Sequence, residues 1–486
     1  MEEGNRSGGQ GTVRSGLLTG ISTAVVSVSA AVLGVILARK FGHGVKTDGF
    51  FAAYGVYLAL VLVASSLRVI VLPRFATARS TGRLPDEVTT WMVAIAAPLL
   101  VLTVLAVAVP DTLASALTSS SAARDQAAEL IPWVVVSAVA QIYGGLVASA
   151  LAALDDYAWA AYGFAIGSIA GVVLTLALVD HGVVAFGWGL ALNGVLSLAI
   201  PLVPLLARRN FGRPRGGVGG RLVELCQGVA LPVALQGLYL IAYRFASGLG
   251  TGRATTFSYA YLIASFLVAI TASSIALVTT VPFAREGASP TRVARHVVAI
   301  SWLSLAVVAA AAGVFVLVSE QVVRRVLGAS YGGGTGAELG RLVVYLAPWM
   351  IAAIAVTVTY PLVFVRAGAR WLPPLALAAL AVQVVVEWAG SAAFGLGGVA
   401  AGLALTTALV LGEILARLGA LACVARGLLV AAVVCGGVGA LAFGLPKLVV
   451  GPYAAAAVGL AAYTVALALW RPPGLRHAWA YVRTLQ

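Results

Sequence analysis

The sequence predicts an all-α polytopic membrane protein with about 14 transmembrane helices, arranged as two pseudo-symmetric six-helix lobes plus two C-terminal helices. Its composition, the spacing of its apolar segments and an internal repeat give this prediction. Of the 486 residues, 61% are hydrophobic and 10% are charged, and the mean hydropathy is +1.01. Soluble domains average about 25% charged residues, so this composition indicates a chain that is mostly embedded in lipid.

The apolar segments divide the chain at regular intervals. About 20 apolar residues cross a hydrocarbon core roughly 30 Å thick. Breakers such as Pro110, Pro290 and Pro446 lie between these segments. The predicted spans are residues 17–38, 49–72, 88–109, 128–152, 157–179, 183–207, 222–244, 254–281, 294–318, 341–364, 371–390, 396–418, 427–445 and 449–470.

The basic residues predict the orientation of these spans. With the N-terminus inside, twenty Lys and Arg residues lie on the inner side and ten on the outer side, which leaves Arg68 within a span. Cytoplasmic loops carry such an excess of Lys and Arg, so both termini are expected in the cytoplasm. The net charge of +14 therefore indicates orientation and contact with anionic lipids, and excludes nucleic acid as the expected partner.

A basic inner segment and a repeat predict the domain organisation. Residues 208–221 hold five arginines among glycine and proline, and they separate six predicted spans from eight. Segments starting at Gly44 and Gly252 match, with Thr47 aligned to Thr255 and Ala64-Ser65-Ser66 to Ala272-Ser273-Ser274, and Pro73 aligned to Pro282 after one inserted residue. Parallel repeats of this kind are typical of secondary transporters. The expected parts are an N-terminal lobe (1–207), a cytoplasmic linker (208–221), a C-terminal lobe (222–418), two additional spans (427–470) and a cytoplasmic tail (471–486).

Two stretches resemble a known family. LARKFGHGVKTDGFFAAY (Leu37–Tyr54), followed by Pro73-Arg74-Phe75, is similar to the first loop and second helix of the MurJ/MviN branch of the multidrug/oligosaccharidyl-lipid/polysaccharide (MOP) exporter superfamily. The segment Val326–Ala353 is similar to the link between that branch's ninth and tenth helices. The resemblance implies a fold of six, six and two helices. It also implies flipping of a polyprenyl-pyrophosphate-linked saccharide by alternating access, with no cofactor.

The family's cavity arginines are absent from the aligned positions. The first predicted span has no charge, and the stretches Gly55–Leu60 and Tyr259–Ile263 have no arginine where the family places them in its second and eighth helices. Three alternatives stay open: the peptidoglycan precursor lipid II, another polyprenyl-linked cell-envelope glycolipid, or an inactive relative.

The candidate substrate-binding residues are the charges nearest the expected path. Arg68 is the first of them, because arginine can bind a phosphate through two hydrogen bonds, although it is also placed to extend towards the headgroups. Asp48 is expected either to cap the second span or to form a breakable pair with Lys46 or Arg39. Arg244 and Arg253 flank the outer loop between the seventh and eighth spans, where snorkelling towards the headgroups is the alternative to substrate binding.

Two acids inside apolar spans are candidates for ion coupling, because an ionisable group in the membrane is costly. Glu413 and Arg417 stand four residues apart, so they share a helix face and are expected to pair. Glu387 lies beside Trp388, which leaves an interfacial position as its alternative. The three cysteines and four histidines have no metal-ligand spacing, and no nucleotide-binding motif is present. Energy is therefore expected from the membrane potential or an ion gradient.

These observations predict a flippase, and not an enzyme, in the bacterial plasma membrane. Its expected partners are a polyprenyl-linked saccharide, membrane lipids and cell-envelope synthesis enzymes, including those of peptidoglycan. A drug/cation antiporter of the same superfamily is the first alternative, and it requires a membrane-buried acid such as Glu387. A multi-span polyprenyl-phosphate glycosyltransferase is the second, and it requires acidic residues in a sizeable loop. The predicted loops are all short, which disfavours that alternative.

Overall fold

The computed structural model describes residues 3–214, 216–273, 289–366 and 368–483. Its contacts divide the chain into two compact units, Met1–Leu240 and Ile241–Gln486. The boundary lies inside α8 (Val218–Ser247), the helix that follows the basic segment 208–221. Each unit has its own clusters of buried apolar side chains.

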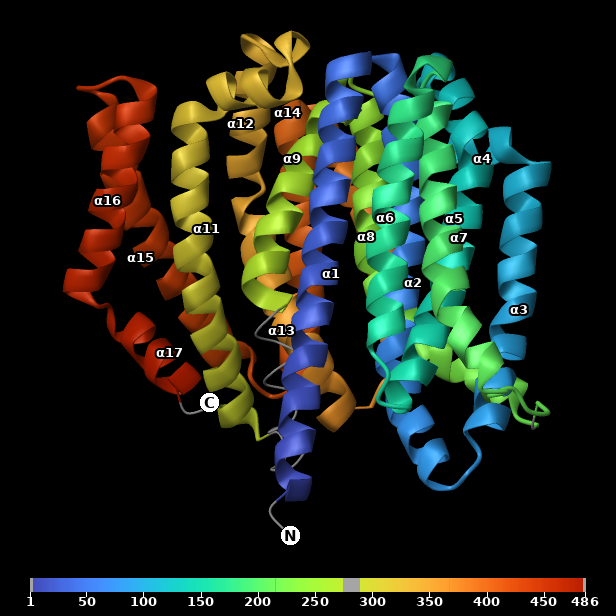
Figure 1. The fold of residues 1–486 in the computed structure, drawn as a ribbon. Helices are drawn as coiled ribbons and strands as arrows, with labels where there is room; N and C mark the ends of the chain where they lie inside the picture. Colours follow the sequence, from blue (N-terminus) through green and yellow to red (C-terminus); the bar gives the residue numbers. More distant parts are fainter. Residues whose placement is uncertain (1–2, 215, 274–288, 367, 484–486) are drawn as a thin grey trace. The chain divides into compact units, whose positions relative to one another are not determined.

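The first unit is a bundle of long helices joined by short turns (Figure 1). Proline lies in the first turn of α3, at Pro85, and begins α4, at Pro110, where its missing N–H group is not needed. Ser120 caps α5 by accepting a hydrogen bond from the Ala123 amide. The elements before α8 are α1 (Glu3–Phe41), α2 (Val45–Ser80), α3 (Leu84–Ala108), α4 (Pro110–Leu117), α5 (Ser121–Ala153), α6 (Ala158–Leu178), the short η1 (Val179–His181) and α7 (Val184–Ala207).

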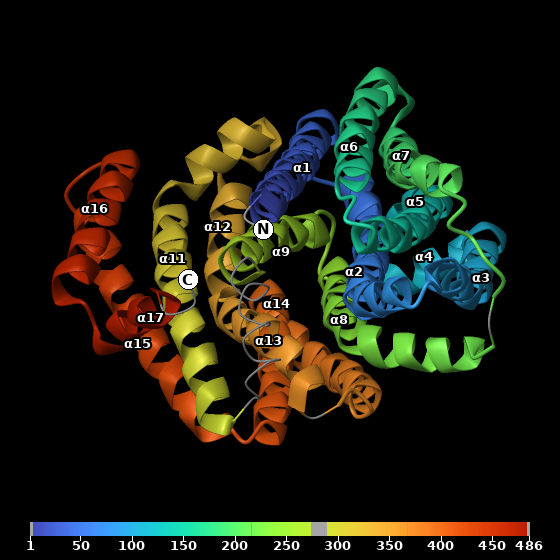
Figure 2. The same cartoon turned by 60° about the horizontal axis from the view of Figure 1, so that its bottom comes forward.

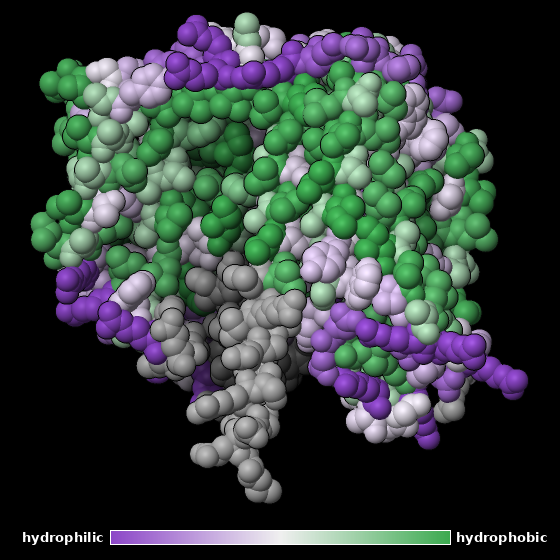
Figure 3. All heavy atoms as spheres, viewed as in Figure 1, coloured by the Kyte–Doolittle hydropathy of each residue, from purple (hydrophilic) through white to green (hydrophobic). Residues whose placement is uncertain are grey.

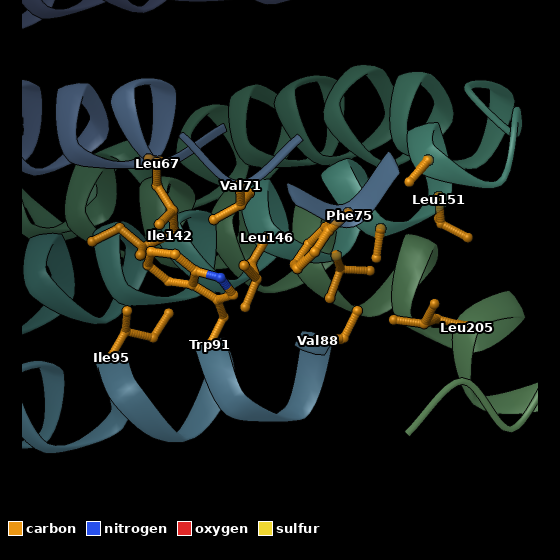
Figure 4. Packing of buried hydrophobic residues seen from close by; sticks show 14 of the residues in the cluster. Leu67, Val71, Phe75, Val88, Trp91, Ile95, Ile142, Leu146, Leu151 and Leu205 are labelled. Carbon is orange, nitrogen blue, oxygen red and sulfur yellow. The ribbon is translucent and has the colours of Figure 1, made fainter. Parts of the chain in front are cut away.

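Helix α5 is the centre of the first unit. Most of its residues are buried, and it packs against α2, α3 and α7. Figure 4 shows the cluster at one end of this packing, where Trp91 of α3 lies against Leu67 and Val71 of α2 and Leu146 of α5. All four side chains are at most 1% exposed. The large ring fills the space between the three helices and makes many van der Waals contacts with them.

Glycine brings α6 and α7 into close contact. The sequence repeats glycine every fourth residue at Gly163, Gly167 and Gly171, which predicts a flat helix face for packing within a lobe. The structure confirms this interpretation, because a Cβ at Gly167 would lie 2.7 Å from the Asn193 carbonyl oxygen of α7. A Cβ at Gly189 on α7 would in turn overlap Thr175 of α6.

The second unit begins with the last turns of α8 and ends with the C-terminal helices, seen together in Figure 2. A cluster around Trp302 joins α11 to α15 and α17, and a cluster around Phe443 joins α11 to α15 and α16. The elements are α9 (Arg253–Val268), η2 (Ala269–Ser273), α11 (Pro290–Leu327), η3 (Ala329–Tyr331), α12 (Gly334–Tyr345), α13 (Ala347–Arg366), α14 (Leu372–Arg417), α15 (Leu421–Lys447), α16 (Pro452–Trp470) and α17 (Pro473–Arg483).

Helix α14 is a helical hairpin. Its 46 residues are interrupted at Gly395, whose φ of 56° and ψ of −135° are not helical. A Cβ at Gly390 would lie 2.9 Å from the Gly398 carbonyl oxygen, and one at Gly402 would lie 3.0 Å from the Glu387 carboxyl carbon. The two halves therefore run antiparallel. Residues 372–394 and 396–417 are each long enough to cross about 30 Å of hydrocarbon.

The number of spans agrees with the prediction of about 14. Within the described residues, twelve helices are long and apolar enough to cross a membrane, and α12 with α13 forms a thirteenth, bent by 45°. Counting the two halves of α14 separately gives fourteen. The bend differs from the uninterrupted tenth span predicted over residues 341–364. The last part of the eighth span, 274–281, and the repeat residues Ser274 and Pro282 lie outside the described residues.

The repeat has a local structural counterpart. Thr47 is the third residue of α2 and Thr255 is the third residue of α9, and both are fully buried. Phe51 and Tyr259, which align in the same repeat, lie one turn further along these helices and are also buried. In Figure 3 apolar side chains cover the middle of the helices and polar side chains gather near their ends, as expected for spans in lipid.

Replacing Gly189 with alanine is expected to destabilise the first unit by about 1–3 kcal/mol, because the added methyl group overlaps Thr175 and the Gly171 carbonyl and forces α6 from α7. The thermal unfolding midpoint of the detergent-solubilised protein should fall. Gly34→Ala in α1 is the matched control, because no atom lies within 4 Å of the added Cβ. Equal midpoints for the two variants would contradict the close contact.

Candidate functional site

A buried acid lies at the interface between the two halves of the α14 hairpin, called the seam. Glu387 and Gln383 are each 0% exposed, and the Gln383 Nε2 atom donates a hydrogen bond of 2.5 Å to Glu387 Oε1. The hairpin contacts place Gly402 against the Glu387 carboxylate, and the same register places Thr406 at the level of Gln383. Gly402 has no side chain, and this leaves room for the carboxylate.

Three oxygen atoms of this seam lack a hydrogen-bond partner among the described residues. They are Glu387 Oε2, Gln383 Oε1 and Thr406 Oγ1. A buried carboxylate is stable only when a proton or a cation compensates its charge. The seam therefore offers a carboxylate, an amide oxygen and a hydroxyl to a small cation or a proton. The neighbouring Trp388 faces outward instead and is 69% exposed.

The second predicted acid lies at the surface. Glu413 and Arg417 form the expected ion pair, with 2.6 Å between Glu413 Oε1 and Arg417 Nε. The Arg417 guanidinium also lies 4.7 Å from the centroid of the Trp371 ring. Both charged side chains are more than 40% exposed, so the pair is solvated and contributes at most about 1 kcal/mol. The structure thus separates this pair from Glu387.

Among the residues of the α1–α2 turn, Asp48 is buried and Lys46 is exposed. Asp48 is not the N-cap of α2, which corrects that interpretation. Gly44 is the N-cap, and the Thr47 hydroxyl accepts from the Gly44 amide at 3.0 Å and donates to its carbonyl at 2.8 Å. Lys46 Nζ lies 5.7 Å from the centroid of the Phe41 ring, and Arg39 is exposed near the end of α1.

Arg68 lies on α2 with an exposed side chain. Its aliphatic part packs over Gly145 of α5, where a Cβ would come within 3.5 Å of Arg68 Cγ. Its guanidinium has no hydrogen-bonded or ionic partner among the described residues. By contrast, Arg74, further along α2, pairs with Glu224 of α8 at 2.6 Å. Arg68 is therefore free to bind an anion.

Sequence reasoning missed a polar contact beside an aromatic stack on α2. Phe50, Tyr54 and Tyr57 stack in turn, with ring centroids 5.3 Å and 5.5 Å apart. Gln141 of α5 donates a hydrogen bond of 2.6 Å to the Tyr57 hydroxyl. Spacings of four and three residues put the three rings on one helix face, which was the available signal. No sequence signal links Tyr57 to Gln141.

One of the two outer candidates of the second unit lies at a pocket of 410 Å³. Arg253 lines this pocket and forms an ion pair with Glu338 of α12. Tyr345 and Phe394 add exposed aromatic rings to its wall. Arg244 is half-buried near the end of α8 and does not line the pocket.

An apolar groove of 470 Å³ lies within the second unit. It is formed by α11, α15 and the residues where α12 meets α13. Small residues of α15, among them Gly436, Gly439 and Ala440, form one wall, and Lys447 is the charged residue of its lining. A groove with these walls fits a linear hydrocarbon chain. No group of three His, Cys, Asp or Glu side chains with the arrangement of a metal site occurs in the described part of the chain.

No protein-family model and no curated protein sequence matches the chain. Several solved structures resemble it. The lipid II flippase MurJ in an inward closed conformation has a TM-score of 0.74 and 13% identity, covering 94% of this chain and 99% of that one. An inward-facing multidrug resistance MATE family transporter of the MOP superfamily has a TM-score of 0.65 and 12% identity, covering 84% and 95%. A MOP superfamily transporter from Pyrococcus furiosus, described as having a binding pocket of reverse polarity, has 0.53 and 13%, covering 87% and 96%.

These likenesses confirm the expected resemblance at the level of fold. The chain has the all-α, MurJ-like fold of MOP superfamily exporters. The proteins that share this fold are described as transporters and a flippase. At these identities the fold alone is established.

The substitution Tyr57→Phe is expected to lower the stability of the first unit by about 1–3 kcal/mol, because it leaves the buried Gln141 amide without its acceptor. The measurement is again the thermal unfolding midpoint in detergent. Tyr54→Phe serves as the control, since the Tyr54 hydroxyl has no hydrogen-bond partner within the described ranges. A drop of similar size in both variants would show that the hydrogen bond from Gln141 is not responsible.

Proposed function

We propose that the protein is a flippase that moves a polyprenyl-pyrophosphate-linked saccharide, lipid II or a related cell-envelope glycolipid, across the bacterial plasma membrane by alternating access. The observation that supports this most is the apolar groove of the second unit, formed in part by α15. This helix follows the two predicted six-helix lobes. A drug carrier has no evident use for an added hydrocarbon groove, whereas a carrier of a polyprenyl lipid must accommodate a long apolar tail.

The charged residues supply the second part of the proposal. Arg68 would bind the pyrophosphate, because an unpaired guanidinium offers two parallel hydrogen bonds to a phosphate. Asp48, Arg39 and Lys46 in the first unit, with Arg244 and Arg253 in the second, are proposed as further contacts along the route. Tyr57, the last residue of the aromatic stack on α2, lies in the stretch Gly55–Leu60, where the family has arginines. This difference favours a glycolipid other than lipid II.

The orientation and the domain division are part of the same proposal. Both termini would face the cytoplasm, where the excess of arginine lies. Residues 1–207 and 222–418 would act as lobes that alternate in access, joined by the linker 208–221. The pair 427–470 would hold the lipid tail. Cell-envelope synthesis enzymes that build the saccharide are the proposed partners on the cytoplasmic side.

Energy would come from the membrane potential and an ion gradient. An inside-negative potential favours outward movement of an anion by about 2.3 kcal/mol per charge per 100 mV. Glu387 is the proposed coupling group, because its buried carboxylate requires a proton or a cation. Glu413 and Arg417, which are solvated and paired, would instead stabilise the end of α14.

The same buried acid supports a second candidate function, drug/cation antiport. An antiporter needs an acid in the membrane that exchanges an ion for a cationic substrate, and Glu387 meets that requirement. The two functions differ in substrate, so transport of labelled glycolipids and of cationic dyes by the same vesicles separates them.

In vesicles containing the purified protein, Arg68→Ala is expected to slow the flipping of a fluorescent polyprenyl-pyrophosphate saccharide by about 10–100-fold, because one charge-assisted contact is lost. The rate is read from protection of the label against an impermeant quencher. Asp48→Asn, tested alongside, should give a smaller loss.

Arg83→Ala is the matched control, since Arg83 is exposed in the turn after α2 and is not paired in the described structure. It should transport at the normal rate. Dye transport without any glycolipid movement would overturn the proposal in favour of antiport.

A second expectation concerns coupling. Glu387→Gln keeps the shape of the side chain but removes its charge, so flipping should continue at a rate that no longer responds to a pH or sodium gradient across the vesicle. The solvated pair provides the control, and Glu413→Gln should keep the full gradient response. If Glu387→Gln responds as the unmodified protein does, Glu387 is not the coupling group.

A further inference from the structure

All charged residues in the C-terminal part of the second unit are basic. Residues 418–486 contain five Lys and Arg residues and no Asp or Glu. Four of the five, Arg426, Arg471, Arg476 and Arg483, lie at the start of α15, at the end of α16 and in α17. No acidic residue of this segment offsets these positive charges. This end of the second unit is therefore expected to attract anions.

Helix α17 belongs to the second unit and lies beside α11 and α15 (Figures 1 and 2). Its inner face is fixed, since Gly474 lies against the Trp302 ring, Ala478 is fully buried, and the Tyr481 hydroxyl is 3.1 Å from His296 Nδ1. Its outer face presents Arg476, Trp479 and Arg483. A short helix with a basic outer face and an exposed tryptophan is typical of helices that lie in the headgroup region.

A cleft of 340 Å³ lies where this helix meets α15 and α16. Its walls are mainly apolar and include Trp302, Val430 and Trp470. Arg426 is the one charged residue of the lining, and its side chain is exposed and unpaired in the described part of the chain. An apolar cleft with one cation at its edge is complementary to an amphiphile that carries one negative charge.

We propose that this cleft binds an anionic phospholipid, with the phosphate on Arg426, an acyl chain between the two tryptophans, and α17 resting on the surrounding anionic headgroups. A phosphodiester carries one charge and so matches the single arginine. Each basic residue near such a surface adds to the attraction. The same end of the unit carries Arg292, Arg295 and Arg417, and under the proposed orientation this places the lipid in the inner leaflet.

The test is native mass spectrometry of the full chain in detergent, titrated with phosphatidylglycerol or with phosphatidylcholine of the same acyl chains. The unmodified protein should prefer phosphatidylglycerol. Arg426→Gln should weaken phosphatidylglycerol binding about tenfold and leave phosphatidylcholine nearly unaffected, because one charge-assisted contact is lost. Val430→Trp, which fills the apolar part of the cleft, should weaken both lipids. Arg295→Gln, an exposed arginine at the same end but outside the cleft, should bind as the unmodified protein does.

Three results would overturn the inference. The first is equal phosphatidylglycerol binding by Arg426→Gln and the unmodified protein. The second is equal binding of the two lipids by the unmodified protein, which would show that the basic residues do not recognise an anionic headgroup. The third is displacement of the lipid by millimolar glycerol phosphate, which would assign the site to a free phosphate. None of these measurements depends on transport, so the inference and the flippase proposal can fail separately.

Discussion

Within hydrocarbon, each backbone N–H and C=O group must be bonded inside the chain, and the rest of this structure depends on that constraint. It leaves the long helix as the available element. Lipid tails are as apolar as leucine, so helices gain little from burying apolar side chains against one another. Close packing replaces that driving force. Contacts through small residues therefore hold the structure together, as between Gly189 and Thr175 and between Gly390 and Gly398.

The polar side chains within the spans differ in whether their hydrogen-bonding groups are satisfied. Several side-chain hydroxyl groups in the spans bond to the carbonyl one turn earlier, as Thr359 does with Ala355 and Thr407 does with Leu403. Glu387 and its neighbour Gln383 instead bond to each other and leave oxygen atoms unsatisfied. Arg68 leaves a guanidinium unpaired. Groups that cost stability in lipid, and are not needed for packing, are the ones to which function is most reasonably assigned.

The second unit combines three surfaces of different chemistry. The α14 seam offers oxygen atoms to a small cation or a proton, the groove beside α15 offers an apolar wall, and the α17 end offers basic residues and tryptophan. A carrier of a charged lipid needs each of these: a coupling site, a place for the tail and a contact with the leaflet. The second and third surfaces both include residues of α15, which indicates what helices beyond the two predicted lobes can contribute.

The sequence by itself determined the spans, their breakers and the local pairs, because each depends on residues within a few turns of one another. The pairing of Glu413 with Arg417 and the glycine face of α6 are of this kind. The tertiary structure decided what depends on distant residues. The hydrogen bond from Gln141 to Tyr57 joins residues 84 positions apart. Whether Glu387 faces lipid or the seam depends on how the chain folds back at Gly395, and hydropathy does not record such a reversal.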